Sequence, residues 1–174
     1  MNTDKIIQLR LLKSKFKKIN FTENYQVKFF DKDNYLEYLP EFNYISNLMR
    51  KDFDWYGIPS ESDIHQRFKN NSHCLFWIYD NDPIGWAWSN YNVSPDWKTT
   101  TQELNEGEIY GGGAFLSKTI KRPPNSGLIF YNLTFEYWLE EMNNDVIYQY
   151  SDDWNRVSSI MSYKSGFEKC KFLK

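Results

Sequence analysis

The stretch from Gly107 to Phe167 constrains the fold more than any other part of this 174-residue chain. Small and aromatic residues in Gly107–Leu116 predict a strand that another backbone or a ligand approaches closely. Apolar residues then recur at steps of 3, 4, 3 and 4, which is the spacing of one helix face: Leu128, Tyr131, Phe135, Trp138 and Met142. The run Val146–Tyr150 predicts a second, buried strand. A strand, a helix and a strand of this length favour a right-handed crossover between parallel strands.

A shorter helix is expected after this crossover. Asn143-Asn144 can end the long helix in the left-handed conformation, and Gly166-Phe167 can end the short one. Three residues can cap the short helix: Ser151, Asp152 or Asp153. Its core face is expected to consist of Val157, Ile160 and Met161.

The segment Lys121–Leu128, which enters the long helix, carries the clearest chemical signal. A helix N-terminus presents unpaired N–H groups and the positive end of the helix dipole, which suit a phosphate. Asn125 tolerates left-handed dihedral angles, Ser126 can cap the helix, and Gly127 permits close approach of a ligand. An ordinary helix cap would explain the same residues.

This arrangement resembles the GNAT superfamily of acyl-CoA-dependent N-acyltransferases. In that family a loop of the form Arg/Gln-x-x-Gly-x-Gly/Ala binds the pyrophosphate of coenzyme A, and Arg122 and Gly127 match its first and last positions. The family's second helix is matched by five residues: Asn155, Ser158, Lys164, Gly166 and Phe167. Asn125 replaces the first loop glycine. Because Pro123 and Pro124 have no N–H, the phosphate would rely on Asn125, Ser126, Gly127 and Leu128.

The resemblance implies an α+β fold, with a mixed, mostly antiparallel sheet, a splayed central parallel strand pair and flanking helices. The remaining elements fit this order: a strand at Tyr25–Phe30, helical segments within Tyr35–Met49 interrupted at Pro40, a helix at Glu61–Lys69 capped by Ser60 or Ser62, a hairpin of Cys74–Tyr79 with Ile84–Val93, and a last strand at Phe167–Leu173. The chain ends where the family usually has one more strand. We therefore expect either a sheet that is one strand short or an edge completed by a partner.

Residues 1–24 are expected to form a basic amphipathic helix and a linker, with the acyltransferase domain at 25–174. The first 20 residues hold six basic side chains and one acid, and Ile6, Leu9, Leu12 or Lys13, and Phe16 fall at helical spacing. Such a helix can simply pack on the domain, or it can dock to an anionic membrane surface or an acidic acyl carrier protein.

The resemblance implies transfer of an acetyl group from acetyl-CoA, as co-substrate, to a primary amine by direct attack. Backbone N–H groups near Phe115 and Leu116 would polarise the thioester, Asn155 and Ser158 would contact the cofactor, and Glu108 would act as base through water. Ser162 stands where the family often has a tyrosine that donates a proton to the leaving thiolate. Its neighbour Tyr163 is one candidate for that role, and Tyr148 and Tyr150 are others.

Aromatic residues make up 19% of the chain and suggest an acceptor pocket at these positions: Trp55, Tyr56, Trp86, Trp88 and Tyr110. Alternating aromatics are more often core, but Trp86 and Trp88 share a strand face that could stack a sugar or a base. An amino sugar, or a nucleotide-linked one, is the favoured acceptor. Two alternatives remain open, namely a longer acyl group delivered by a carrier protein and a domain that binds acyl-CoA without catalysis.

Composition excludes several other classes. No run of about 18 apolar residues predicts a membrane span, and the net charge of −2 argues against nucleic acid. Cys74, Cys170, His65 and His73 lack metal-ligand spacing, so we expect no metal, surface or packing roles for the histidines, and a cytoplasmic location.

Overall fold

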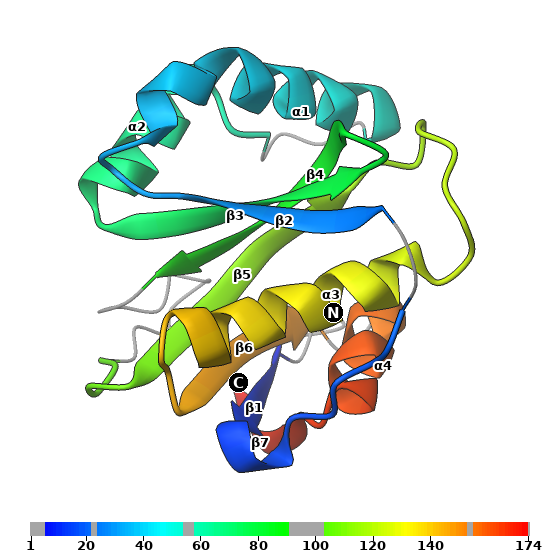
Figure 1. Ribbon diagram of the computed structural model, residues 1–174. Helices are drawn as coiled ribbons and strands as arrows, with labels where there is room; N and C mark the ends of the chain where they lie inside the picture. The colour runs from blue at the N-terminus through cyan, green and yellow to red at the C-terminus, as the bar shows by residue number, and fades with distance from the viewer. Residues whose placement is uncertain (1–5, 22–23, 54–57, 91–102, 153–154, 174) are drawn as a thin grey trace, which may run out of the picture.

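Seven strands form one mixed sheet in the computed structural model, which describes residues 6–21, 24–53, 58–90, 103–152 and 155–173 (Figure 1). The strands are β1 (Ile6–Leu12), β2 (Tyr25–Phe30), β3 (Ser72–Tyr79), β4 (Asp82–Asn90), β5 (Glu108–Leu116), β6 (Val146–Asp152) and β7 (Glu168–Leu173). Their order across the sheet is β2-β3-β4-β5-β6-β1-β7. The pairing of β5 with β6 is parallel, and the other five pairings are antiparallel, which confirms the predicted mixed α+β sheet.

Helices cover both faces of the sheet and divide the core in two. The helical segments are η1 (Lys13–Lys15), η2 (Tyr35–Tyr38), α1 (Leu39–Asp52), α2 (Glu61–Lys69), α3 (Ser126–Glu136) with its π-helical extension η3 (Tyr137–Glu141), and α4 (Arg156–Lys164). In Figure 1, α1 and α2 lie above the sheet, while α3 and α4 lie on its other side. One core cluster, around Phe42, Trp86 and Trp88, lies under α1 and α2, and the other, around Phe130 and Trp138, lies under α3.

The predicted N-terminal helix is wrong, because Ile6–Leu12 is strand β1 in the interior of the sheet. It pairs antiparallel with β6 on one side and β7 on the other. Leu9 and Leu11, two residues apart, are buried on one face, whereas Arg10 between them bonds Glu168. Period two therefore governs this run, and its similarity to helical spacing misled the sequence analysis.

Strand β1 also answers the question of the missing strand. It occupies the place between β6 and β7, so the sheet is complete without a partner strand there. Residues 6–12 belong to the same sheet as the rest of the chain, and the division at residue 24 does not separate them from it. Two lysines beyond β1 pair within the chain, Lys13 with Glu140 at 3.3 Å and Lys18 with Glu136.

Several local predictions are confirmed. Ser60 caps α2, with its hydroxyl accepting from the Asp63 N–H while the Asp63 carboxylate accepts from the Ser60 N–H. Asn143 has a φ of 52° beyond the long helix, and Gly166 has a φ of 104° beyond α4. The Phe167 N–H then donates to the Ser162 carbonyl at 3.1 Å, which closes α4. Pro40, however, lies in the first turn of α1 and begins that helix instead of interrupting it.

Helix α4 reverses its predicted core face and has a different cap. Val157 and Ile160 are 64% and 52% exposed, whereas Ser159 and Ser162 are buried. The cap is Asn155, whose side chain accepts from the Ser158 N–H, because Ser151 and Asp152 still belong to β6; Asp153 lies outside the described residues. The helix thus turns a row of serines toward the sheet and α3.

Candidate active site

The parallel strands β5 and β6 pair over only part of their length. Their register runs from Glu108 opposite Val146 to Gly111 opposite Gln149, and beyond this point they diverge. On its other side, β5 shifts register against β4 between Trp86 and Trp88, beside Gly113, which has a φ of 65°. The predicted splay is therefore present, and a bulge interrupts the pairing of β5 on its other side.

A cavity of about 730 Å³ opens where the two strands part. Its walls come from both core clusters, so it reaches both faces of the sheet through the gap. The side toward α1 and α2 includes Met49, Phe53, Pro59, Arg67, Trp86 and Trp88, and the side toward α3 and α4 includes Trp77, Tyr131, Thr134, Phe135, Trp138, Asn155 and Ser158. The remaining lining residues include Tyr110–Leu116 of β5 and Gln149–Ser151 of β6.

Two of the three consecutive glycines of β5 serve different purposes. A Cβ on Gly111 would lie 2.3 Å from the Trp138 ring, so this glycine lets η3 pack closely on the sheet. Gly113 has the left-handed backbone of the bulge, which other residues adopt at a cost. Close packing therefore explains Gly111, and the bulge explains Gly113.

The loop that enters α3 keeps its helix terminus open. Asn125 is the N-cap, with a φ of 67°, and it makes no side-chain hydrogen bond to the helix. Ser126 is buried: its hydroxyl lies 2.6 Å from the Pro123 carbonyl and 3.0 Å from the Tyr25 hydroxyl. The N–H groups of Gly127 and Leu128 lie in the first turn, where a helix supplies no partner. They are the donors available to an anion.

Arg122 is committed to its own loop. Its guanidinium donates to the Ser117 carbonyl and, at 3.1 Å, to the Ile120 carbonyl. Burial lowers its pKa, against the opposing effect of Asp52. Gly127 also has a packing role, because a Cβ there would lie 2.9 Å from Met161 Cε of α4. Arg122 therefore shapes this anion site more than it supplies charge to it.

Asp52, at the end of α1, fixes the start of the same loop. Its carboxylate accepts from the Ser117 hydroxyl at 2.9 Å, from the Lys118 N–H at 2.5 Å and from the Thr119 N–H at 3.1 Å. Burial alone would raise the pKa of Asp52, but the hydrogen bonds from Thr119, Lys118 and Ser117 outweigh it and lower the pKa. The loop is thus anchored to the opposite helical layer.

The side of the cavity toward α4 is polar. Asn155 and Ser158 line it, and the Tyr131 hydroxyl lies 3.5 Å from Ser158 Oγ. Ser162 is fully buried and donates to Gln149 Oε1 at 2.8 Å, directly behind the wall. Tyr163 is 41% exposed on the outer face of α4 and does not line the cavity.

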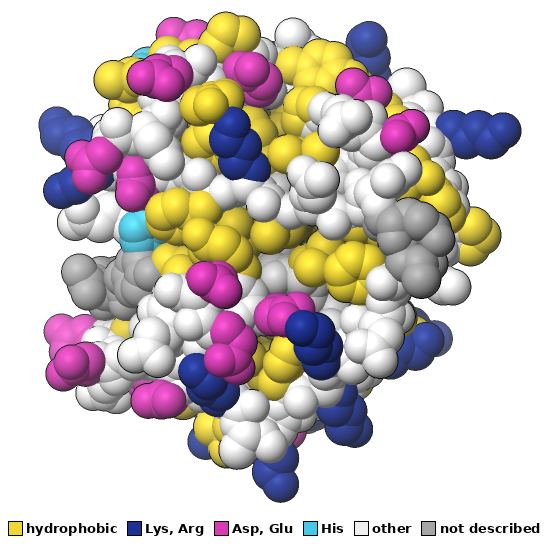
Figure 2. Space-filling view, viewed as in Figure 1, with side chains coloured by type: hydrophobic (Ala, Val, Ile, Leu, Met, Phe, Trp, Pro, Cys, Tyr) yellow, Lys and Arg dark blue, Asp and Glu magenta, His cyan; other side chains and the backbone are white. Residues whose placement is uncertain are grey.

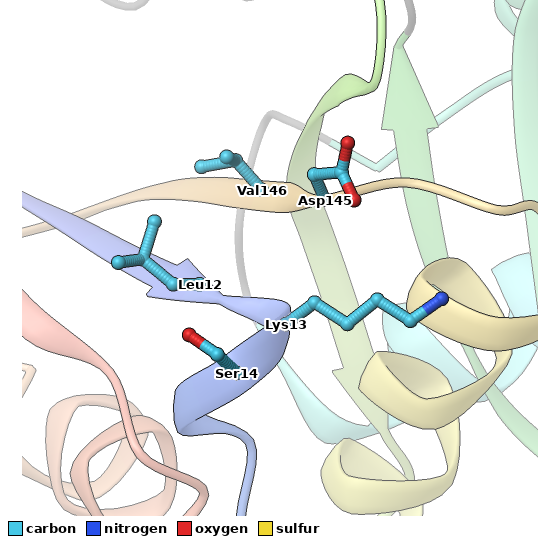
Figure 3. A pocket seen from close by; sticks show the side chains of 5 residues that line it. All are labelled: Leu12, Lys13, Ser14, Asp145 and Val146. Carbon is cyan, nitrogen blue, oxygen red and sulfur yellow. The ribbon is translucent and has the colours of Figure 1, made fainter.

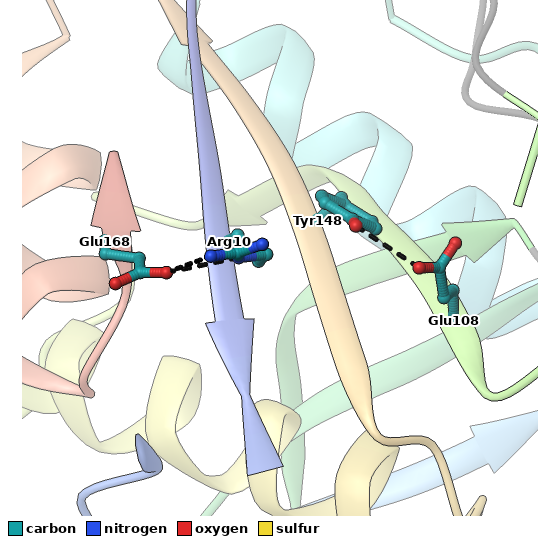
Figure 4. Close-up of polar contacts among 4 residues, drawn as sticks. All are labelled: Arg10, Glu108, Tyr148 and Glu168. Carbon is teal, nitrogen blue, oxygen red and sulfur yellow. Dashed lines mark hydrogen bonds and ion pairs between the residues drawn. The ribbon is translucent and has the colours of Figure 1, made fainter. Parts of the chain in front are cut away.

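Glu108 lies at the paired end of β5, away from the cavity lining. One carboxylate oxygen accepts from the Tyr148 hydroxyl at 3.2 Å, and the other accepts from the Asn105 N–H at 2.9 Å. Figure 4 shows this pair next to Arg10, which reaches Glu168 on the other side. Burial and the Glu108 charge raise the pKa of Tyr148.

Three of the five predicted acceptor residues line the cavity. Trp86, Trp88 and Tyr110 do so, although each is at most 2% exposed and packs in the core. Trp55 and Tyr56 lie outside the described residues. Phe115 and Leu116 of the predicted cofactor set also line the cavity.

Sequence reasoning missed Arg67, Gln149 and, as a site residue, Tyr131. Tyr131 was assigned to the helix core face, and nothing in the spacing distinguishes a cavity wall from a core. Arg67 occupies an ordinary basic position in the last turn of α2. Only the tertiary arrangement brings it to β5, so no local signal identifies it.

A second hollow lies on the outside of the sheet and carries no comparable chemistry. It measures about 490 Å³ and is lined by Leu12, Lys13, Ser14, Asp145 and Val146 (Figure 3). The Lys13 side chain points from it toward η3, where its Nζ donates to the Leu139 carbonyl at 2.9 Å.

The described residues support no metal site and contain no helix suited to crossing a membrane. No group of three potential metal ligands occurs among them. No described helix is long and apolar enough to span a bilayer. His73 stacks on Phe29, and burial lowers its pKa to about 4, which fits a packing role.

On the face in Figure 2, apolar side chains form a band where α3 lies against β2.

The chain was compared with known proteins. No family model matches it, and neither does any curated protein. A GCN5-related N-acetyltransferase from Kribbella flavida superposes with a TM-score of 0.58 at 11% identity, over 98% of this chain and 56% of that one. A tandem GNAT protein from the clavulanic acid biosynthesis pathway gives 0.61 at 8% identity, over 99% and 52%. AAC(6′)-Iy, solved with the bisubstrate analogue CoA-S-monomethyl-acetylneamine, gives 0.57 at 12%, over 87% and 96%.

These likenesses concern the fold. The chain spans little more than half the length of the first two proteins. At 8–12% identity and TM-scores of 0.57–0.61, these likenesses show a shared arrangement of helices and strands. The chain therefore has the GNAT fold of acyl-CoA-dependent N-acetyltransferases.

Proposed function

We propose that this chain transfers an acetyl group from acetyl-CoA to the primary amine of a small molecule. The observation that carries the proposal is the cavity at the β5–β6 gap, which reaches both sheet faces. A donor that enters from the α3 side can meet an amine that enters from the α1 side. Holding two reactants together in this way can lower the activation free energy by about 7–11 kcal/mol.

The residues on the α3 side fit coenzyme A. The first-turn N–H groups of Gly127 and Leu128 and the positive end of the α3 dipole suit its diphosphate. Past Gly111, the edge of β5 that faces β6 is free of strand pairing within the described chain, so an extended thioester arm can lie along it. Backbone N–H groups near Phe115 and Leu116 would then face the thioester carbonyl. Acetyl-CoA supplies the activated acetyl group.

The transfer needs one proton acceptor and one proton donor. The amine nitrogen bonds to the acetyl carbon, the carbon–sulfur bond breaks, and the proton lost by the amine balances the proton gained by the thiolate. Glu108 is the proposed proton acceptor. Because its carboxylate lies outside the cavity lining, it would take the proton through a water molecule.

Tyr131 is the proposed proton donor. Its hydroxyl group lies 3.5 Å from Ser158 Oγ, on the α4 side of the cavity where the thiol would leave. Burial raises the pKa of Tyr131, opposed by the contact with Ser158, so it stays protonated at neutral pH. Ser162 donates to Gln149, and Tyr163 lies outside the cavity lining, so both fit the donor role less well; Tyr150 lines the cavity and is the alternative.

An amino sugar remains the favoured acceptor class. The aromatic wall formed by Trp86, Trp88 and Tyr110 suits an apolar sugar face. AAC(6′)-Iy, which shares this fold, was solved with an acetylneamine analogue. For an acyl carrier protein as donor, the basic N-terminal residues offer less support, because Lys13 and Lys18 pair within the chain.

Thermal unfolding with and without acetyl-CoA tests the donor. At a hundredfold excess over Kd, we expect a stabilisation of about 2.7 kcal/mol, which is roughly 5–10 °C for a domain of this size. Thiol release over a panel of amino sugars, polyamines and peptides then tests the transfer. Stabilisation without thiol release for any amine would favour a binding domain, and no stabilisation at all would refute the proposal.

A further inference from the structure

Arg67 places a charged side chain in the cavity wall, beside the Trp88 ring. It lies in the last turn of α2, is partly buried and lines the cavity. Within the described part of the chain, its guanidinium takes part in no ion pair and no hydrogen bond. The guanidinium instead lies over the Trp88 ring, whose centroid is 4.9 Å from Arg67 Cζ, in a cation–π contact. Burial lowers the pKa of Arg67, against the smaller opposing effects of Cys74 and Asp63.

The nearest acid on the same helix is engaged elsewhere. Asp63 lies one turn earlier, but its carboxylate accepts from the Ser60 N–H at 2.8 Å and from the Ser60 hydroxyl at 2.7 Å. The helix cap therefore uses the carboxylate that an i,i+4 pair would need. Asp63 therefore acts on Arg67 only through its charge, and no described carboxylate forms an ion pair with the guanidinium.

The geometry around Arg67 leaves its donors directed to a ligand. A guanidinium stacked on an aromatic ring keeps the N–H groups at its edge free for paired hydrogen bonds. The Trp88 Nε1–H, on the ring beneath it, is buried and also has no hydrogen-bond partner among the described residues. A Cβ on Gly113 would lie 3.4 Å from Arg67 Nη1, so the guanidinium lies beside the β5 bulge.

Arg67 and the α3 terminus lie on opposite sides of the sheet. Arg67 and Trp88 belong to the layer under α1 and α2, whereas the proposed coenzyme A site lies at the start of α3. The anion for Arg67 therefore comes from the acceptor side.

We propose that the acceptor amine carries an anionic group, a carboxylate or a phosphate, which Arg67 binds beside Trp88. This inference rests on the proposed function, because only that reaction makes the bound amine an acceptor. The binding of the anionic amine itself is measurable without acetyl-CoA.

Matched amines test the proposal by calorimetry in the absence of acetyl-CoA. The pairs are D-glucosamine 6-phosphate with D-glucosamine, and L-phenylalanine with L-phenylalaninamide, which distinguish phosphate from carboxylate. We expect the charged member of at least one pair to bind about 10- to 100-fold more tightly. Arg67→Met should abolish this preference and Arg67→Lys should keep part of it. Arg50→Met, on the exposed side of α1, should leave it unchanged.

Two further readouts separate a binding role from a structural or catalytic one. Because no described residue forms an ion pair with Arg67, Arg67→Met should not lower the melting temperature, and it should leave the acetyl-CoA shift unchanged. In steady-state assays it should raise KM for the charged amine and not for the neutral one. Equal affinity for both members of both pairs, or a fall in kcat shared by both amines, would overturn the proposal. Failure of thiol release alone would count against the proposed function and leave the calorimetric result decisive here.

Discussion

Helices α2 and α3 begin in opposite ways. At α2, Ser60 caps the first turn, and two acids, Glu61 and Asp63, lie at the positive end of the dipole. At α3, the N-cap Asn125 makes no side-chain bond to the helix, and the first turn contains no acid. The first terminus is neutralised by its own sequence, whereas the second is left positive.

This difference separates a cap that stabilises a helix from one that serves a ligand. Both junctions have serine and a turn-forming residue nearby, and the sequence alone gives them similar descriptions. Ser126 is the instructive residue, because its hydroxyl group is buried against Pro123 and Tyr25 instead of capping α3. The open terminus is therefore a property of how the loop packs.

The largest expected effect comes from adding a charge at the open terminus. Asn125→Asp keeps a residue that tolerates the left-handed backbone but places a carboxylate beside the proposed diphosphate. We expect acetyl-CoA affinity to fall about 10- to 100-fold by titration calorimetry. The matched control, Ser60→Asp at α2, should not change it. An equal loss in both variants would mean that the two termini do not differ in function.

The next effect concerns the anchor of the loop. Asp52→Ala removes several hydrogen bonds to Ser117, Lys118 and Thr119, and we expect about 1–2 kcal/mol less free energy of unfolding in urea.

Its pH dependence follows from the lowered pKa. Because the folded carboxyl group releases its proton more readily than the unfolded one, its contribution is complete above the ordinary pKa of 3.8 and is lost as pH falls below that value. The difference between wild type and variant should therefore be constant near neutrality and shrink in acid. A difference that grew in acid would contradict the assignment.

The smallest effect is expected at the closed terminus. Ser60→Ala removes one capping hydrogen bond and should cost about 1 kcal/mol of stability by denaturant unfolding. Acetyl-CoA affinity should stay at the wild-type value. A change in affinity without a change in stability would show that α2 contributes to the cofactor site.

Local chemistry explains which features were predictable. The Ser60 cap, the Gly166 helix end and the crossover around α3 follow from residues close together in the chain. The role of β1 was not predictable in this way, because Ile6–Leu12 suits both a short helix and a strand until β6 and β7 are placed beside it. The prediction of the inward face of α4 was wrong for the same reason. The serines of α4 are buried because Gln149 and Ser151 offer polar partners.

The position of β1 has a consequence for how the molecule assembles. Ile6–Leu12 precedes the other strands in the chain, yet its two neighbours in the sheet, β6 and β7, are the last two strands in sequence order. Closing loops of this length makes a late, slow step, and until then the edges of β6 and β7 lack their bridging strand. An extension fused ahead of β1 would have to leave that insertion unobstructed.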